Sequence, residues 1–122
     1  MSQFSIAHVV RLRDGTFAVR STEFPSCEGR DIQMWPAREK FRAALSEHVR
    51  EMIEHGEMPR LYPSLGDAEA KFGEHCRQQI PAEDRMPNSF DYATIVDLHL
   101  PPDDADRLAA LRIEELLPEA RL

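Results

Sequence analysis

The sequence of 122 residues predicts an α+β fold of two layers, with a small antiparallel sheet packed on one amphipathic helix. Two observations predict this fold. Residues 4–20 contain two stretches of strand-forming side chains joined by Asp14-Gly15, which is the pattern of a β-hairpin. Residues 37–53 instead carry apolar side chains at the period of a helix. A single helix covering one face of a small sheet gives a two-layer domain.

The first predicted elements are three strands. Apolar side chains occupy every second position of residues 4–12, which predicts a half-buried strand. Asp14-Gly15 tolerates positive φ and favours a tight turn into a return strand at 16–20. Residues 27–31 are predicted to form a short third strand, which Gly29 weakens because glycine has no side chain to pack.

The helix that follows is the most regular element of the sequence. Gln33 or Trp35 is expected near its start, with Pro36 in the first turn, where a missing N–H costs nothing. Gly56 is expected to end the helix as a left-handed cap. The apolar stripe consists of Ala37, Phe41, Ala44, Leu45, His48, Val49, Met52 and Ile53.

The pattern is weaker beyond residue 64. Residues 67–79 are expected to form a helix capped by Asp67, and residues 81–89 a polar loop. Residues 93–100 alternate as a strand should, and Asp103 is expected to cap a last helix. The apolar side of that helix is predicted to be Leu108, Leu111 and Leu116.

We therefore divide the chain into one domain and a tail. The domain spans residues 1–100 and includes a loosely structured insertion at 65–92, and a helical tail follows at 101–122. The predicted order of elements, β-β-β-α-β, resembles part of the ribonuclease H architecture. A chain of this length is one domain of ordinary size.

The net charge of −7 is unevenly distributed along the chain. Residues 1–64 contain nine basic and nine acidic side chains, whereas residues 65–100 carry −4 and residues 101–122 carry −3. Such a chain is a poor candidate for gripping nucleic acid, which requires clustered Lys and Arg. A basic protein partner suits this charge better. The alternative is that the acidic surface keeps the protein soluble.

Location in the cell is predicted from three features of the sequence. No apolar run approaches the roughly 20 residues of a membrane span. The N-terminus has no basic region followed by an apolar core, so we expect no secretory signal. Two cysteines do not form a disulfide framework. We therefore expect a cytoplasmic protein.

The sequence contains no convincing catalytic or metal-binding motif. A ribonuclease H-type metal site needs several converging carboxylates, yet residues 4–12 contain none. His75 and Cys76 are neighbours on a predicted helix and point in different directions. We predict no catalytic residue, no cofactor and no bound metal. A weak hydrolase that uses His75, Cys76 or Asp97 is the alternative.

A set of five residues is predicted to bind a partner. Met34 and Trp35 lie beside the turn at the start of the helix, where they would form an exposed apolar anchor. Arg38 and Arg42 follow on the same helix, and Asp97 lies in the last strand. The alternative for Trp35 is that its ring covers the edge of the sheet.

Residues 9–64 contain a series of short motifs in a recognisable order. They are Asp14-Gly15, Phe17, Phe24-Pro25-Ser26-Cys27, Gln33, Ala37, Ala44-Leu45, Gly56-Glu57, Pro59 and Pro63-Ser64. In this order they resemble the HicB-type antitoxin domain of bacterial HicA–HicB toxin–antitoxin systems. Three positions depart from that pattern: Ser26 replaces a glycine, Asp31 stands where a glycine is expected, and Pro36 replaces a glutamate.

The resemblance implies a degenerate ribonuclease H-like fold without catalysis. It also implies binding to a small basic toxin ribonuclease, whose catalytic histidine the antitoxin covers. From the otherwise unpaired edges of the small sheet we expect a homodimer or higher homo-oligomer. Many family members carry a C-terminal DNA-binding module. Here residues 95–101 and the helix after them imitate a ribbon-helix-helix start, but Asp97 is not a base-reading donor. We do not expect this chain to bind DNA alone. The alternatives are an orphan member with another regulatory partner and, less favoured, a DNA-binding autoregulator.

Overall fold

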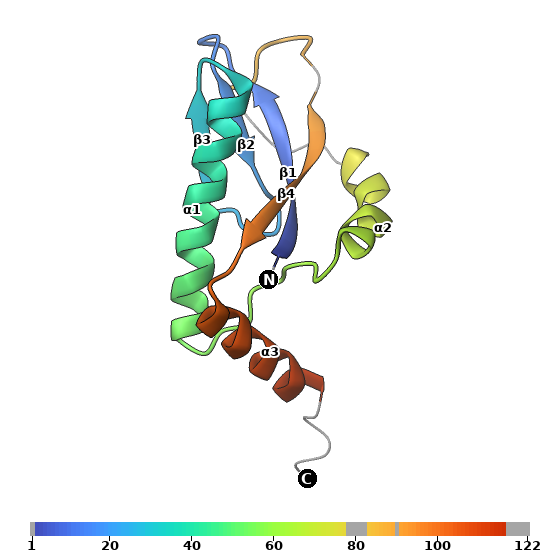
Figure 1. The fold of residues 1–122 in the computed structure, drawn as a ribbon. Helices are drawn as coiled ribbons and strands as arrows, with labels where there is room; N and C mark the ends of the chain where they lie inside the picture. The colour runs from blue at the N-terminus through green and yellow to red at the C-terminus, as the bar shows by residue number, and fades with distance from the viewer. Residues whose placement is uncertain (1, 78–82, 90, 117–122) are drawn as a thin grey trace.

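The computed structural model describes residues 2–77, 83–89 and 91–116. Its sheet lies between α1 on one face and α2 on the other, with α3 below (Figure 1). The elements are β1 (Ser2–Arg11), β2 (Phe17–Arg20), β3 (Glu28–Asp31), α1 (Met34–Glu54), α2 (Leu65–Cys76), β4 (Tyr92–His99) and α3 (Pro102–Leu116).

The four described strands form one antiparallel sheet in the order β3-β2-β1-β4. His8 of β1 lies opposite Arg20 of β2 and Ala93 of β4, so these three side chains share one face of the sheet. The predicted α+β class is confirmed, and so are the hairpin and the short third strand. β3 and β4 are the two edges of the described sheet.

α1 covers one face of the sheet and supplies much of the core. It begins at Met34 after the N-cap Gln33, and Gly56, with φ of +73°, follows its C-cap, as predicted. The N–H of Gly56 donates to the Ile53 carbonyl and that of Glu57 to the Met52 carbonyl, which together form a Schellman motif. Five residues of the predicted stripe are buried: Ala37, Phe41, Leu45, Val49 and Ile53.

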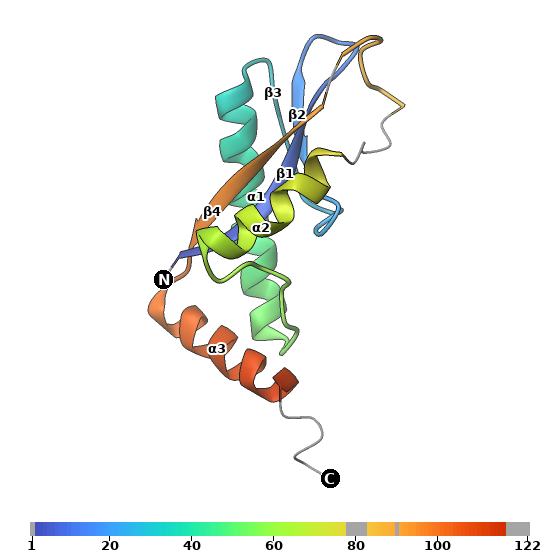
Figure 2. The ribbon, with the colours of Figure 1, turned by 90° about the vertical axis from the view of Figure 1, so that its right-hand side faces the viewer.

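The opposite face of the sheet is also covered, and the prediction of a half-buried first strand was therefore wrong. Seen at 90° from the first view, α2 lies across β1 and β4 (Figure 2). Val10, Leu12 and Ala18 form a second small core cluster on this side. The segment around Asp84 crosses the same face. The Asp84 carboxylate forms ion pairs with Arg20 of β2 at 3.0 Å and with Arg30 of β3 at 3.2 Å.

α2 begins two residues before the predicted helix, because its cap is not Asp67. Ser64 is the N-cap, and its hydroxyl oxygen accepts a hydrogen bond from the Asp67 N–H at 3.1 Å. Asp67 lies in the first turn, where its carboxylate suits the positive end of the helix dipole.

Ser64→Ala is expected to destabilise the docked α2 by about 1 kcal/mol, because the first turn loses its side-chain acceptor. Hydrogen exchange of the amides of residues 66–76 measures the effect, which should be a loss of about fivefold in protection. Ser46→Ala is the matched control: Ser46 lies inside α1, where alanine is a better helix former. Equal protection of α2 in both variants would contradict the capping role.

α3 packs at the lower end of α1. It begins at Pro102, so Asp103 lies in its first turn and is not its cap, contrary to the prediction. Leu108 is buried in the main core, whereas Leu116 is exposed. Arg112 joins α3 to β1 by donating to the Gln3 side-chain carbonyl at 2.7 Å. No helix among the described residues combines the length and the apolar character needed to cross a membrane.

Candidate protein-binding surface

The fold brings the five predicted partner-binding residues together. Met34, Trp35, Arg38 and Arg42 lie along the first half of α1, and Asp97 lies on the neighbouring edge strand β4. The Arg42 guanidinium contacts the Asp97 carboxylate at 2.9 Å, which joins the helix to the strand. Residues 55 positions apart in the chain thus meet at one sheet edge.

Trp35 is exposed at the start of α1. Its side chain is 62% exposed, and the Arg38 guanidinium lies over its ring at 5.1 Å from the centroid. A cation in this position limits the freedom of the ring without burying it. The exposure favours an apolar anchor over a cover for the sheet edge.

Two further apolar side chains enlarge this anchor, and the sequence did not single them out. Ile32 is 74% exposed immediately before α1, and Tyr92 is exposed at the start of β4 with its hydroxyl against the Met34 sulfur. The exposure of Ile32 could have been predicted from the sequence, since the residue is apolar yet lies outside the helix stripe. The exposure of Tyr92 could not have been predicted, because tyrosine is common in strands. We call the combined set the Trp35 surface; it consists of Ile32, Met34, Trp35, Arg38, Arg42, Tyr92 and Asp97.

Exposed large apolar side chains concentrate on this surface. Four of the seven that are found among the described residues belong to it. Isolated exposed apolar residues are normal on any protein, but a group of them marks an interaction site. The other three are Leu65, Ile113 and Leu116.

Cations from α1 engage backbone carbonyls at both edges of the sheet. Arg38 donates to the Ile95 carbonyl of β4 at 2.7 Å, and Lys40 donates to the Arg30 carbonyl of β3 at 3.2 Å. Positive side chains of this kind are a common way to protect a sheet edge from pairing with another chain. A partner strand at β4 would have to displace Arg38.

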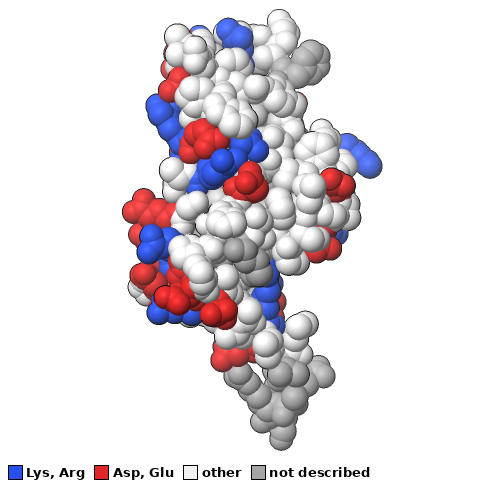
Figure 3. Space-filling view, viewed as in Figure 1, with Lys and Arg blue, Asp and Glu red and all other residues white. Residues whose placement is uncertain are grey.

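Acidic side chains gather where α1 ends and α3 begins. Figure 3 shows red atoms there at the lower left, with blue atoms among them. Glu51 and Glu54 lie in the last turn of α1, which contains no basic residue. The negative end of the helix dipole disfavours carboxylates at this position. The position of these two carboxylates lowers the stability of the fold, which suggests that they serve a role other than folding.

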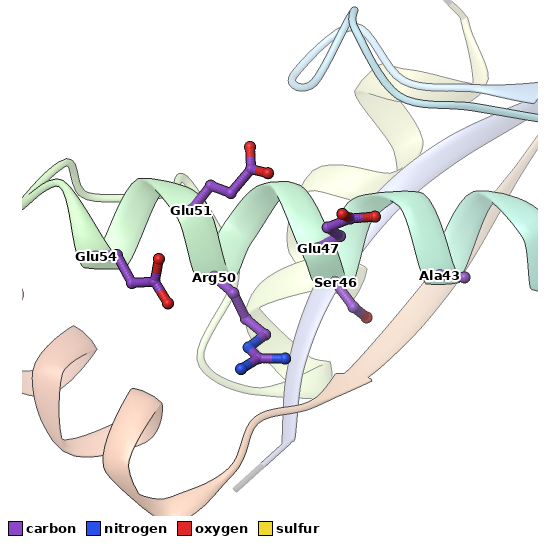
Figure 4. A pocket seen from close by; sticks show the side chains of 6 residues that line it. All are labelled: Ala43, Ser46, Glu47, Arg50, Glu51 and Glu54. Carbon is purple, nitrogen blue, oxygen red and sulfur yellow. The ribbon is translucent and has the colours of Figure 1, made fainter.

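The same side of α1 carries a shallow hollow of about 470 Å³. All six lining residues come from this one helix, so no second element closes over a small ligand (Figure 4). A surface of this shape suits contact with a protein more than enclosure of a substrate. The lining residues are Ala43, Ser46, Glu47, Arg50, Glu51 and Glu54.

The three residues of the hydrolase alternative lie in different settings. His75 is buried against the sheet, while Cys76 beside it is exposed. Asp97 pairs with Arg42 at the sheet edge. Burial raises the pKa of the other thiol, that of Cys27, which keeps it protonated and unreactive. In residues 2–77, 83–89 and 91–116, no group of three or more His, Cys, Asp or Glu side chains is placed to hold a metal ion.

Comparisons with known proteins give no relative. No family model, no curated protein and no solved structure matches this chain. What the chain does must therefore be inferred from its own residues and from the geometry of the Trp35 surface.

Proposed function

We propose that this protein is a non-catalytic binding protein of the HicB type, which neutralises a small basic ribonuclease toxin in the cytoplasm. The observation that carries the proposal is the Trp35 surface. Its apolar side chains gather around the start of α1: Met34 contacts Tyr92 of β4, Trp35 follows Met34, Ile32 lies two residues before the helix, and all four are exposed. Exposed Trp, Tyr and Met flanked by Arg have the composition of interface hot spots.

The charge of the chain supports a basic partner. The Trp35 surface itself is nearly balanced, because Arg42 is paired with Asp97 at 2.9 Å and with Glu39 at 3.2 Å. The excess of negative charge lies farther along α1 and at the start of α3. This negative charge would attract and orient a partner with a basic face as it approaches the Trp35 surface.

The length of α1 fits an interface of ordinary size. Its 21 residues span about 30 Å at 1.5 Å per residue. A standard interface buries about 800 Å² on each side, which corresponds to a patch of similar width. One partner can therefore contact both the apolar anchor at the start of α1 and the acidic residues at its end.

Co-purification from the native host followed by a rescue assay tests this function. The chain should retain a small basic protein whose expression alone stops growth, and co-expression of the chain should restore growth. Absence of such a partner, or a partner whose toxicity the chain does not relieve, would sink the antitoxin proposal. A partner that is not toxic would instead favour an orphan protein with another regulatory role.

DNA binding and self-association are measured separately. A gel-shift titration against the upstream DNA should show no binding by the chain alone, because α3 begins with three acidic residues in its first five. We further propose a homodimer or higher homo-oligomer formed through an edge of the sheet. Light scattering across a concentration series tests it, and a strictly monomeric protein would exclude it.

A further inference from the structure

Two histidines meet in the interior on the side of the sheet away from α1. His8 of β1 is 1% exposed, and His75 of α2 is 7% exposed. Their ring centroids are 5.8 Å apart with the planes tilted by 40°. The Trp35 surface does not include either residue, so the pair is independent of the proposed function.

Neither ring is hydrogen-bonded at its buried nitrogen. His8 Nε2 and His75 Nδ1 are enclosed and have no partner among the described residues. A neutral imidazole can present an unprotonated nitrogen there at a modest cost. A protonated imidazole has an N–H on both nitrogens and a positive charge, so it needs acceptors that this site does not offer.

The charged groups around His8 do not compensate for the cost of protonating its buried ring. Asp91 faces it, but the Asp91 carboxylate is already paired with Arg85. Arg20 lies opposite His8 on β2 and is itself positive, while Ala93 on β4 is uncharged. On α2 the facing group is His75. Burial, followed by the nearby His75, lowers the pKa of His8 below its usual range, and Asp91 opposes this in part.

α2 is attached to the sheet by a small buried area. Within Leu65–Cys76 the buried residues are Ala68 and His75, so His75 is a large share of what holds the helix in place. Elements with few buried contacts open before the rest of a protein does. A charge created under α2 would therefore act on this helix before it acts on α1.

We propose that His8, buried against His75, forms an acid-operated latch, which holds α2 on the sheet while the His8 ring is neutral and releases it when that ring gains a proton. The direction follows from proton linkage. A histidine whose pKa is lower in the folded state binds protons more readily once it is released. The docked state is then fully stable above about pH 6.5, the value of a free histidine, and loses stability as the pH falls below it.

Hydrogen exchange of the intact chain at about pH 7.5 and about pH 5.5 tests the latch, after correction for the intrinsic pH dependence of exchange. We expect the amides of α2 to lose up to about tenfold in protection at the lower pH, the limit that one histidine sets over this range, while those of α1 change little. His8→Phe keeps a ring in place but cannot gain a proton, so its α2 should stay protected at both values.

His55→Gln is the matched control, since His55 is exposed at the end of α1 and should leave the loss unchanged. His8→Gln provides a second variant if His8→Phe does not fold. Protection of α2 that does not depend on pH in the natural chain would overturn the latch. So would an unchanged loss in a folded variant that lacks the His8 ring.

Discussion

Gly29→Ala is expected to destabilise the protein by about 3 kcal/mol or more, and so to leave much of it unfolded. A Cβ at Gly29 would lie 2.9 Å from the Phe41 Cα and still closer to the Phe41 nitrogen and the Ala37 carbonyl oxygen. These are backbone atoms of α1, so no flexible side chain can move aside. Urea denaturation followed by circular dichroism measures the loss.

Gly73→Ala is the matched control for the same substitution. Gly73 lies inside α2, and the nearest atom to a Cβ there is the end of the flexible Arg77 side chain at 3.9 Å. Alanine in a helix is favoured over glycine by about 0.5–1 kcal/mol, so this variant should be slightly more stable than the natural chain. If Gly29→Ala were as stable as Gly73→Ala, the close packing of α1 on β3 would be wrong.

Trp35→Ala is expected to weaken binding of the basic partner by at least about 2 kcal/mol, which is about 30-fold in Kd. Trp35 is the largest exposed side chain of the Trp35 surface, and truncation removes its whole contact area. The stability of the free protein should change little, because the ring is 62% exposed. Calorimetric titration with the co-purified protein measures the affinity, and thermal unfolding checks the fold.

Ile113→Ala provides the comparison for Trp35→Ala. Ile113 is 57% exposed on α3, so it matches Trp35 in exposure but lies outside the Trp35 surface. Its removal should leave Kd within about twofold, as expected for an apolar residue outside the contact. Equal losses in the two variants would mean that the Trp35 surface is not the site of binding.

The parts of the fold that depend on local pattern were predictable from the sequence. The stripe from Ala37 to Ile53 fixed both the position of α1 and the face that it buries. Asp14-Gly15 fixed the hairpin, and Gly56 fixed the end of the helix. Each of these depends on residues a few positions apart, so the chain itself specifies them.

The parts that depend on distant contacts were not predictable. Gly29 appeared to weaken a strand, whereas its lack of a side chain is what lets α1 approach β3. The ion pairs of Asp84 and the contact between His8 and His75 join segments more than 50 residues apart. No spacing in the sequence marks such pairs, and together they cover the second face of β1.

The grouping of residues in the Trp35 surface was predictable in part. Met34 and Trp35 were singled out because they lie beside the turn at the helix start and are residue types that interfaces favour. The meeting of Arg42 with Asp97 required the position of β4 at the sheet edge, which the order of elements does not reveal. The contact of Tyr92 with Met34 also depends on the position of β4, so it was not predictable either.

The central claim is that the Trp35 surface receives a basic protein. Hydrogen exchange of the chain with and without its co-purified partner tests it most directly. We predict new protection at the start of α1 and along β4, within residues 32–42 and 92–97, and little change in α2. Protection confined to α2 or α3, with residues 32–42 and 92–97 unchanged, would contradict the claim.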